Sequence, residues 1–308
     1  MAKQEDALRP KMHSRNIPQE IFWDTNIVME EATPSRTALR VALRRAAHQL
    51  YDSPVVFDDP MAVPVLGKAY DEELRRTPRR ADRPFSISLR AFLVVRSRYA
   101  EDNLKHAVAS GVRQYVLLGA GLDTFAHRNP YAQLRVFEVD HPSTQAWKRE
   151  LLERNVIATP TGLTYVPVDF ESQSLAERLQ ASGFDRNAPA FFAWLGVVPY
   201  LTPAAFRATL QCIQGQAAGS GVVFDYARPR AALPPLEQLA YDSLASRVQN
   251  AGEPFQLAFT LEEMATELSG FRSVEDIGSV EMNARYFQGR TDQLAVRGTA
   301  GRVVCAWL

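Results

Sequence analysis

The chain has 308 residues, 46% of them hydrophobic, which is enough to bury a sizeable core in a globular protein. Thirty-five basic residues balance 35 acidic ones, so the absence of net charge argues against nucleic acid as a partner. Two cysteines exclude a disulfide framework, and the five histidines form no HxxxH or HExxH pair, so we predict no metal site.

Residues 1–33 are polar and show little pattern, so we interpret them as an N-terminal arm. This segment lacks the apolar core of a signal peptide, and no apolar stretch of the chain approaches the roughly 20 residues of a membrane span. We therefore expect a cytoplasmic protein without a membrane partner.

Two helices are predicted in residues 34–110, which we interpret as a helical lid. Ser35 can cap the first helix, which runs to Leu50 and places Arg36 in its first turn, where a cation gains nothing from the helix dipole. The second helix, Ser86–Ser110, places Arg96 on or beside its apolar face. Each arginine is either a ligand for an anion or an ordinary charge: Arg36 in solvent, Arg96 paired with Glu101 or Asp102.

The stretch from Gln114 to Pro142 organises the rest of the chain. An apolar, β-prone run at Tyr115–Leu118 ends at once in Gly119 and Gly121, and a second apolar run at Leu134–Val139 ends in Asp140. Glycine lets the backbone approach a ligand closely, and a carboxylate at the end of the next strand can accept hydrogen bonds from ribose hydroxyls. The order strand, glycine turn, crossover, strand, acid predicts a parallel α/β sheet with a site for a ribose-containing cofactor.

The glycine turn lacks the features of a dinucleotide site. A dinucleotide fingerprint has a third glycine three residues further on, where this chain has Thr124, and Asp123 would repel a pyrophosphate. S-adenosylmethionine contains ribose and adenine, has no phosphate and carries a positive sulfonium, so we infer that it is the cofactor. The alternatives are a tight turn in an ordinary α/β sheet, and a nicotinamide-dependent reductase, which Thr124 and Asp123 disfavour.

After Asp140, a helix is predicted at Trp147–Asn155 and a third strand at Leu163–Val168. This strand ends in Asp169 and Phe170, which can bind the exocyclic amine and the face of an adenine; alternatively, Asp169 only caps the next helix.

The remaining predicted elements complete an α/β core at residues 111–308. A helix at Ser174–Ser182 is followed by a central strand at Ala190–Leu195, a helix that begins at Thr202, and a strand at Gly221–Tyr226. Residues 228–269 are predicted to be a helical insertion that walls the acceptor pocket. The last strands are expected at residues 270–277 and 302–308.

Several motifs in this order resemble the leucine carboxyl methyltransferase-related family of S-adenosylmethionine-dependent methyltransferases. The resemblance extends from about Thr33 to Tyr226 and rests on SRTA, VVRSRYAEDNL, VLLGAGLDT, FEVDHP, VDF and WLGVVPYLT. It implies a class I methyltransferase fold, which is a Rossmann-like, mostly parallel α/β sheet of seven strands with an N-terminal helical lid. It also implies that Arg36 and Arg96 hold the methionine carboxylate, that Asp140 binds ribose, and that Asp169 and Phe170 flank adenine.

The predicted cofactor-binding residues are therefore Arg36, Arg96, Gly119, Ala120, Gly121, Asp140, His141, Asp169, Phe170 and Leu195. Relatives close to the leucine carboxyl enzymes commonly have a glutamate where this chain has Leu195, so the resemblance favours a small-molecule hydroxyl or carboxyl acceptor over a protein C-terminus.

The sequence assigns no catalytic residue. Candidate bases near the expected mouth of the site are Tyr200, Asp225, Tyr226, His127 and His141, and a carboxylate acceptor would need none. A catalytically silent cofactor-binding protein is a further alternative. The sequence leaves the identity of the acceptor and the oligomeric state open.

Overall fold

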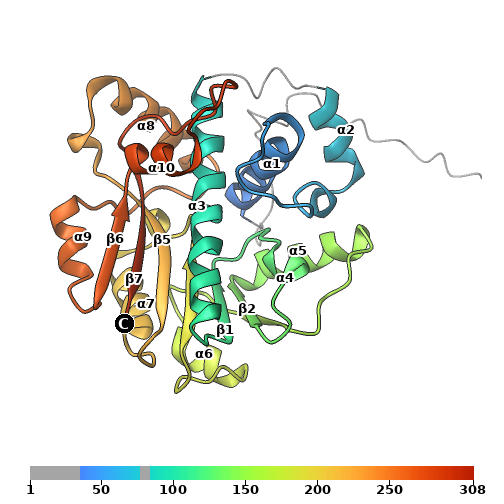
Figure 1. Ribbon diagram of the computed structural model, residues 1–308, viewed down its shortest axis with the longest axis vertical. Helices are drawn as coiled ribbons and strands as arrows, with labels where there is room; N and C mark the ends of the chain where they lie inside the picture. The colour runs from blue at the N-terminus through green and yellow to red at the C-terminus, as the bar shows by residue number, and fades with distance from the viewer. Residues whose placement is uncertain (1–34, 77–83) are drawn as a thin grey trace, which may run out of the picture. The chain divides into compact units, whose positions relative to one another are not determined.

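The computed structural model describes residues 35–76 and 84–308, all within the compact unit Thr33–Leu308. The predicted arm at residues 1–33 lies outside the described residues. Seven strands form one sheet in the order β3-β2-β1-β4-β5-β7-β6 (Figure 1). They are β1 Gln114–Leu118, β2 Arg135–Asp140, β3 Leu163–Pro167, β4 Ala190–Trp194, β5 Gly221–Ala227, β6 Ser273–Ile277 and β7 Gly301–Trp307.

Strands β3, β2, β1, β4 and β5 are parallel, whereas β7 runs antiparallel between β5 and β6. This mostly parallel seven-stranded sheet confirms the predicted class I methyltransferase fold. Because the carboxyl ends of parallel strands lie at one edge of a sheet, the loops after β1, β2, β3 and β4 meet there.

Helices precede, connect and follow these strands. Before β1 lie α1 Arg36–Tyr51, η1 Pro64–Leu66, α2 Lys68–Arg76 and α3 Pro84–Ala109. Between β1 and β5 lie α4 Phe125–Arg128, α5 Pro142–Arg154, α6 Leu175–Ala181, η3 Val198–Tyr200 and α7 Pro203–Gln214. After β5 come η4 Arg230–Ala232, α8 Pro235–Gln249, α9 Leu261–Glu267 and α10 Ser279–Tyr286. None of these described helices is both long enough and apolar enough to cross a membrane.

Capping residues fix where the helices near the glycine turn begin. The Ser35 side chain accepts a hydrogen bond from the Ala38 amide at 3.1 Å, which confirms the predicted cap of α1. Helix α5 begins at Pro142, five residues before the predicted start, because the His141 ring accepts the Ser143 amide and proline suits the first helical position.

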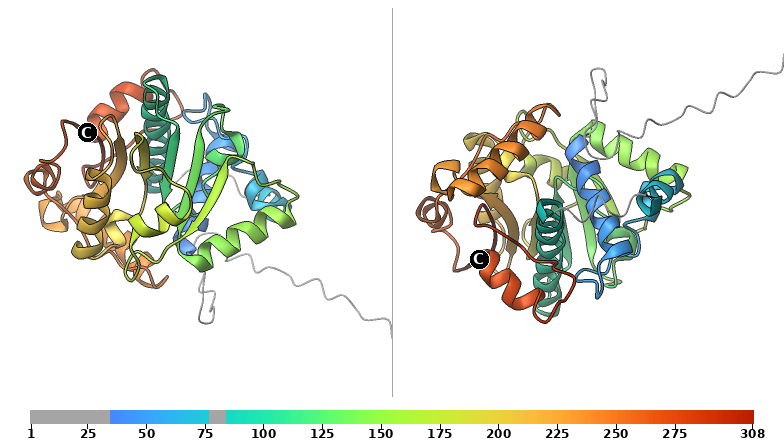
Figure 2. Two further views of the ribbon diagram at one scale, coloured as in Figure 1. Left: turned by 90° about the horizontal axis from the view of Figure 1, so that it is seen from below. Right: turned by 90° about the horizontal axis from the view of Figure 1, so that it is seen from above.

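Helices cover both faces of the sheet (Figure 2). Strand β1 is buried throughout and alternates between the two faces. Tyr115 and Leu117 belong to the core that contains residues of α3, α4 and α10, whereas Val116 and Leu118 belong to the core that contains residues of α6, α7 and α9. The near-continuous apolar run of β1 follows from this double burial.

A buried ion pair ties α5 to β2 and to the loop after β1. The Lys148 ammonium lies 2.6 Å from the Glu138 carboxylate and donates to the backbone oxygen of Asp123 at 2.6 Å. Both charged side chains are only 1% exposed. Burial raises the pKa of Glu138 despite the opposing effect of Lys148.

Removal of this cation should be costly. We expect Lys148→Met to destabilise the fold by about 3–5 kcal/mol at neutral pH, because Glu138 would remain buried without a partner. Protonated Glu138 needs no cation, so the loss should shrink as the pH falls toward the unperturbed carboxyl pKa of about 4.3. Urea unfolding at pH 8 and pH 5 measures both effects.

Lys68→Met is the matched control, because Lys68 forms an exposed i,i+4 pair with Glu72. It should leave the urea midpoint unchanged. Equal midpoints for the two variants would contradict a structural role for the buried pair.

Candidate functional site

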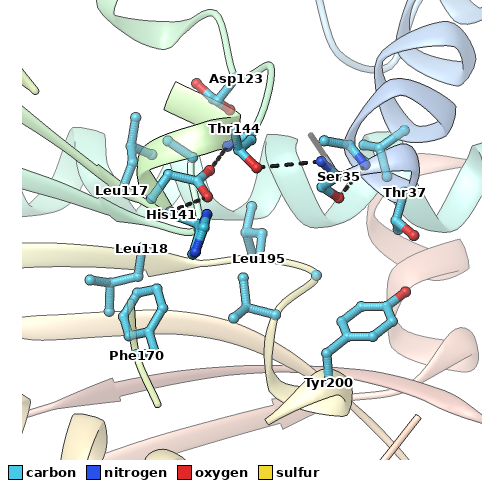
Figure 3. A pocket seen from close by; sticks show the side chains of 18 of the residues that line it. Ser35, Thr37, Leu117, Leu118, Asp123, His141, Thr144, Phe170, Leu195 and Tyr200 are labelled. Atoms are coloured by element: carbon cyan, nitrogen blue, oxygen red, sulfur yellow. Dashed lines mark hydrogen bonds between the residues drawn. The ribbon is translucent and has the colours of Figure 1, made fainter. Parts of the chain in front are cut away.

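A cavity of about 570 Å³ lies where the loops after β1, β2, β3 and β4 meet. The first turns of α1 and residues from the segment after α8 complete its wall. His141 and Phe170 lie at one end of the view in Figure 3, and Thr37 and Tyr200 lie at the other. Arg96 and Ser97 of α3 line it as well, so the cavity brings together residues that are far apart in the sequence.

The two glycines after β1 are fixed by close packing against other protein groups. Gly119 has a φ of +67°, and a Cβ there would lie 2.2 Å from the Val197 side chain. Gly121 has a φ of +49°, and a Cβ there would lie 3.1 Å from the Ala38 side chain. The turn is thus held between α1 and the loop after β4, which leaves no room for a larger residue at Gly119.

The backbone amides of this turn are already used. Gly119 and Ala120 donate to the backbone oxygen of Val139 at 2.8 and 3.0 Å, and the Gly121 amide donates to the Asp140 carboxylate. A pyrophosphate site needs amides that point freely at the ligand. Their engagement with β2 and its acid is a physical reason, beyond the missing third glycine, against a dinucleotide.

Asp140 lies at the end of β2 and lines the cavity. Its two oxygens accept the amides of Gly121 and His141, which leaves acceptor capacity on each oxygen for ribose hydroxyls. Burial raises the pKa of Asp140, and the two amide hydrogen bonds oppose this rise. His141 lines the cavity beside it and is exposed.

Asp169 and Phe170 line the same cavity after β3. The Asp169 carboxylate accepts the Glu171 amide at 3.0 Å and the Ser172 hydroxyl at 2.7 Å, and these hydrogen bonds lower its pKa. Asp169 therefore shapes the turn before α6, whose N-cap is Ser174. This turn places Asp169 beside Phe170 at the cavity, where both remain predicted adenine contacts.

Arg96 projects from α3 into the cavity wall and is 7% exposed. Its partner is neither Glu101 nor Asp102, which bind Arg128 and Arg98. Instead, the Arg96 Nη1 atom donates to Asp225 on β5 at 2.8 Å, and the other oxygen of Asp225 accepts the Gly196 amide at 2.6 Å. The alternative of an ion pair with an internal acid is therefore present, but its acid is Asp225, 129 residues away, and not a neighbour on α3, because sheet formation brings Asp225 to this place.

The other predicted cofactor residues differ in their placement. Ala120 and Leu195 line the cavity, whereas Arg36 is half-buried in the first turn of α1 and is not among the lining residues. The neighbours of Arg36, Ser35 and Thr37, do line it. The role predicted for Arg36 remains a prediction.

Asp123 belongs to a network of charges that its position in the sequence does not reveal. Arg45 of α1 lies 3.4 Å from the Asp123 carboxylate and donates to the Thr124 hydroxyl at 2.8 Å. Burial alone would raise the pKa of Asp123, but Arg45, Arg128 and Lys148 outweigh it and hold the pKa below its usual value. These cations compensate the Asp123 charge, so its repulsion of a pyrophosphate is weaker than the sequence suggests.

Residues that the sequence did not mark as site residues lie at the far end of the cavity. Thr37, Glu253 and Gln256 line it there with Tyr200. Among the candidate bases, Tyr200 and His141 line the cavity, whereas the other three do not: Asp225, Tyr226 and His127. Glu253 and Gln256 belong to no sequence motif. They lie after α8 in the insertion, and only the folded chain brings them to the cavity.

Comparison with known proteins agrees with this arrangement. Residues 38–214 match the sequence profile of the leucine carboxyl methyltransferase family. The chain belongs to this family. YktD of Bacillus subtilis, assigned as an S-adenosyl-L-methionine-dependent methyltransferase, is 31% identical over 87% of this chain and 96% of its own length. A similarly assigned protein of Mycobacterium sp. (strain JLS) is 34% identical over 64% of this chain and 77% of its own length.

Solved structures share the fold of this methyltransferase. A protein from Thermobifida fusca YX, described as a methyltransferase, superposes with a TM-score of 0.54 over 90% of this chain and 96% of that chain, at 18% identity. A DUF574 family protein from Streptomyces avermitilis superposes with a TM-score of 0.53 over 87% of this chain and 96% of that chain, at 17% identity.

The methyltransferase uses S-adenosyl-L-methionine as its cofactor, and the cavity residues suit it. An acid after β2, an acid and an aromatic ring after β3, and a buried guanidinium match the ribose, the adenine and the carboxylate of this molecule. The occupied amides of the glycine turn are compatible with a ligand that lacks phosphate. Family membership also sets aside the nicotinamide-dependent reductase.

Asp140→Asn should weaken the binding of S-adenosylmethionine by roughly 1.5–3 kcal/mol. The asparagine side chain has one acceptor oxygen, which cannot serve two backbone amides and the ribose hydroxyls as well. Calorimetric titration gives the affinity, and a thermal melt checks the fold. Glu150→Gln, an exposed acid on α5, is the control and should bind normally. Unchanged affinity in folded Asp140→Asn would refute the ribose assignment.

Arg96→Gln should lower the affinity for S-adenosylmethionine by about tenfold or more and spare decarboxylated S-adenosylmethionine, which lacks the carboxylate. Asp225→Asn is the companion variant, because it releases Arg96 from its ion pair and should preserve tight binding. Equal losses for both ligands in Arg96→Gln would make Arg96 a structural residue only.

Proposed function

We propose that this methyltransferase transfers a methyl group to an oxygen of a small molecule, either a hydroxyl or a carboxyl group. The observation that supports this proposal is a second, polar end of the cavity beyond the glycine turn, where Tyr200 and Gln256 are among the lining residues. This end would receive the acceptor, and a cavity of about 570 Å³ has the size of a small-molecule site.

The proposed division of labour follows the layers of the fold. Residues 111–308 form most of the core that binds the cofactor. Of the predicted lid, residues 34–110, α1 walls the cavity, whereas α3 packs in the core and carries Arg96. The insertion at 228–269 closes the acceptor end, since its Gln256 amide donates to the backbone oxygen of Pro199 at 2.8 Å and its side chain donates to that of Tyr200 at 2.7 Å.

Tyr200 is suited to donate a hydrogen bond and not to act as a base. Burial raises the pKa of Tyr200 to about 12, so its hydroxyl keeps its proton at neutral pH. It can donate to the acceptor oxygen and orient it. Acceptors whose oxygen is ionised or acidic, namely carboxylates and phenols, fit such a site best.

Methyl transfer depends mainly on the alignment of the acceptor oxygen with the methyl carbon. When bound, S-adenosylmethionine supplies a methyl group that its sulfonium already activates. The protein then has to hold the acceptor oxygen in line with that carbon and exclude water, which can supply several orders of magnitude in rate. Leu195 adds an apolar side chain to the cavity, where close relatives of the leucine carboxyl enzymes have an acid, and this difference supports a small-molecule acceptor over a protein C-terminus.

Transfer of labelled methyl groups tests the proposal. We expect the protein to label small phenols or carboxylic acids, such as 4-nitrophenol and phenylacetate homologues, and not a peptide with a C-terminal leucine. Alkaline hydrolysis separates the two products, because a methyl ester releases methanol and a methyl ether does not. Labelling of the peptide alone would refute the small-molecule proposal. No transfer to any acceptor, with cofactor binding intact, would favour a catalytically silent protein.

Tyr200→Phe should lower kcat by up to about tenfold and leave the affinity for S-adenosylmethionine unchanged, since it removes one hydrogen bond to the acceptor. Tyr131→Phe removes a hydroxyl that does not line the cavity and is the control. Unchanged kcat in Tyr200→Phe would remove Tyr200 from the acceptor site.

A further inference from the structure

The charges that line the cavity are unevenly matched. Arg45 and Arg96, the arginines among its described lining residues, each already contact an internal carboxylate. At the nucleoside end, Asp140 accepts backbone amides and Asp169 accepts the Ser172 hydroxyl. At the other end, Glu253 also lines the cavity. Burial lowers the pKa of Arg40 on α1 and Glu253 opposes this fall, but no ion pair within 4.0 Å joins Glu253 to a cation of the described residues.

Glu253 is connected to the glycine turn through the first turn of α1. Its Oε2 atom accepts the amide of Thr37 in the first turn of α1 at 3.2 Å. The next residue, Ala38, packs against Gly121, where an added Cβ would lie 3.1 Å from the Ala38 side chain. The Glu253 carboxylate is therefore held at the first turn of α1, one residue before the side chain that packs against Gly121.

The Glu253 carboxylate keeps acceptor capacity. Its Oε1 atom makes no hydrogen bond with any part of the chain that the structure describes. The backbone amide of Glu253 donates to the Val248 oxygen at 2.9 Å, which anchors the residue to the end of α8. A carboxylate with one oxygen on a helix amide and the other without a partner among the described residues can receive a cationic donor.

Arg96 supplies the complementary charge at this end. Its Nη1 atom binds Asp225, whereas its Nη2 atom lies 2.7 Å from where a Cβ on Gly196 would stand. Burial raises the pKa of Tyr200, Glu253 raises it further, and Arg96 lowers it, so both charges act on the same phenol. Both side chains line the same cavity, and the segment of Glu253 is joined to Tyr200 by Gln256, whose side chain donates to the Tyr200 backbone oxygen at 2.7 Å.

We infer that Glu253 binds the α-ammonium group of S-adenosylmethionine while Arg96 meets its carboxylate. The amino-acid end of this cofactor is a zwitterion, and a buried ammonium is costly unless an acceptor meets it. Glu253 and Arg96 offer the two opposite charges that such a zwitterion requires. This inference rests on the cofactor and does not depend on which acceptor the proposed function assigns.

An alternative occupant for Glu253 is a cationic group of the methyl acceptor. The hydrogen bond to Thr37 favours the cofactor, because it ties the carboxylate to the helix turn that packs on Gly121 and not to the outer wall. The two possibilities differ in a binding experiment that contains no acceptor.

Calorimetric titration with two ligands tests the inference. The ligands are S-adenosylhomocysteine and its analogue without the α-amino group, each titrated into the wild-type protein and Glu253→Gln. Glutamine has the same size and can still accept the Thr37 amide through its side-chain oxygen, so the cavity wall is preserved. We expect the wild-type protein to prefer S-adenosylhomocysteine by about tenfold to a hundredfold, and Glu253→Gln to lose most of this preference.

Glu262→Gln is the matched control, because Glu262 is an exposed acid at the start of α9 and does not line the cavity. It should keep the wild-type preference. Glu253→Asp retains the charge on a shorter side chain and should keep part of it, which covers the case of a poorly folded glutamine variant.

The inference is overturned if Glu253→Gln keeps the full preference for the amino group, or if it weakens both ligands equally. It is also overturned if the wild-type protein binds the two ligands with the same affinity. Because no methyl acceptor is present in these titrations, a failure of the proposed O-methyl transfer would leave their outcome unaffected.

Discussion

The glycine turn after β1 is the constraint on which the rest of the site depends. Its amides are bonded to the end of β2 and to Asp140, and its two glycines lie against Val197 and Ala38. A side chain at Gly119 would push away the loop after β4, which carries Leu195 and Gly196 into the cavity. One short turn thereby sets the positions of the ribose acid, the first helix of the lid and the loop that leads to Tyr200.

Buried charges hold the surrounding elements in register. Lys148 joins α5 to β2 and to the backbone of Asp123, and Arg45 joins α1 to the side chains of Asp123 and Thr124. Because a buried charge without a partner is costly, such contacts tolerate little displacement of either element. The polar groups around the cavity are therefore fixed before any ligand arrives, which is the condition for a reaction that depends mainly on alignment.

The family assignment and the proposed acceptor rest on different parts of the molecule. Residues 38–214, which match the family, contain the nucleoside end of the cavity and the glycine turn. Glu253 and Gln256 lie beyond this match, in the segment between α8 and α9. The nucleoside end of the cavity is thus built from the shared part of the chain, whereas its other end includes a segment outside that part. A family named for leucine carboxyl methylation can accommodate other acceptors in this way.

The sequence by itself determined the strands, the capped first helix, the glycine turn, and the acids Asp140 and Asp169, because these depend on local periodicity and on residues next to strand ends. It could not determine that Asp225 pairs with Arg96, or that Arg45 compensates Asp123, because those partners are 129 and 78 residues apart and meet only through sheet order and helix packing. The predicted start of α5 was five residues too late for a local reason, because the His141 cap gives no periodic signal. The place of Glu253 in the cavity was the least predictable from the sequence, because only the folded chain brings its side chain onto the amide of Thr37, 216 residues away.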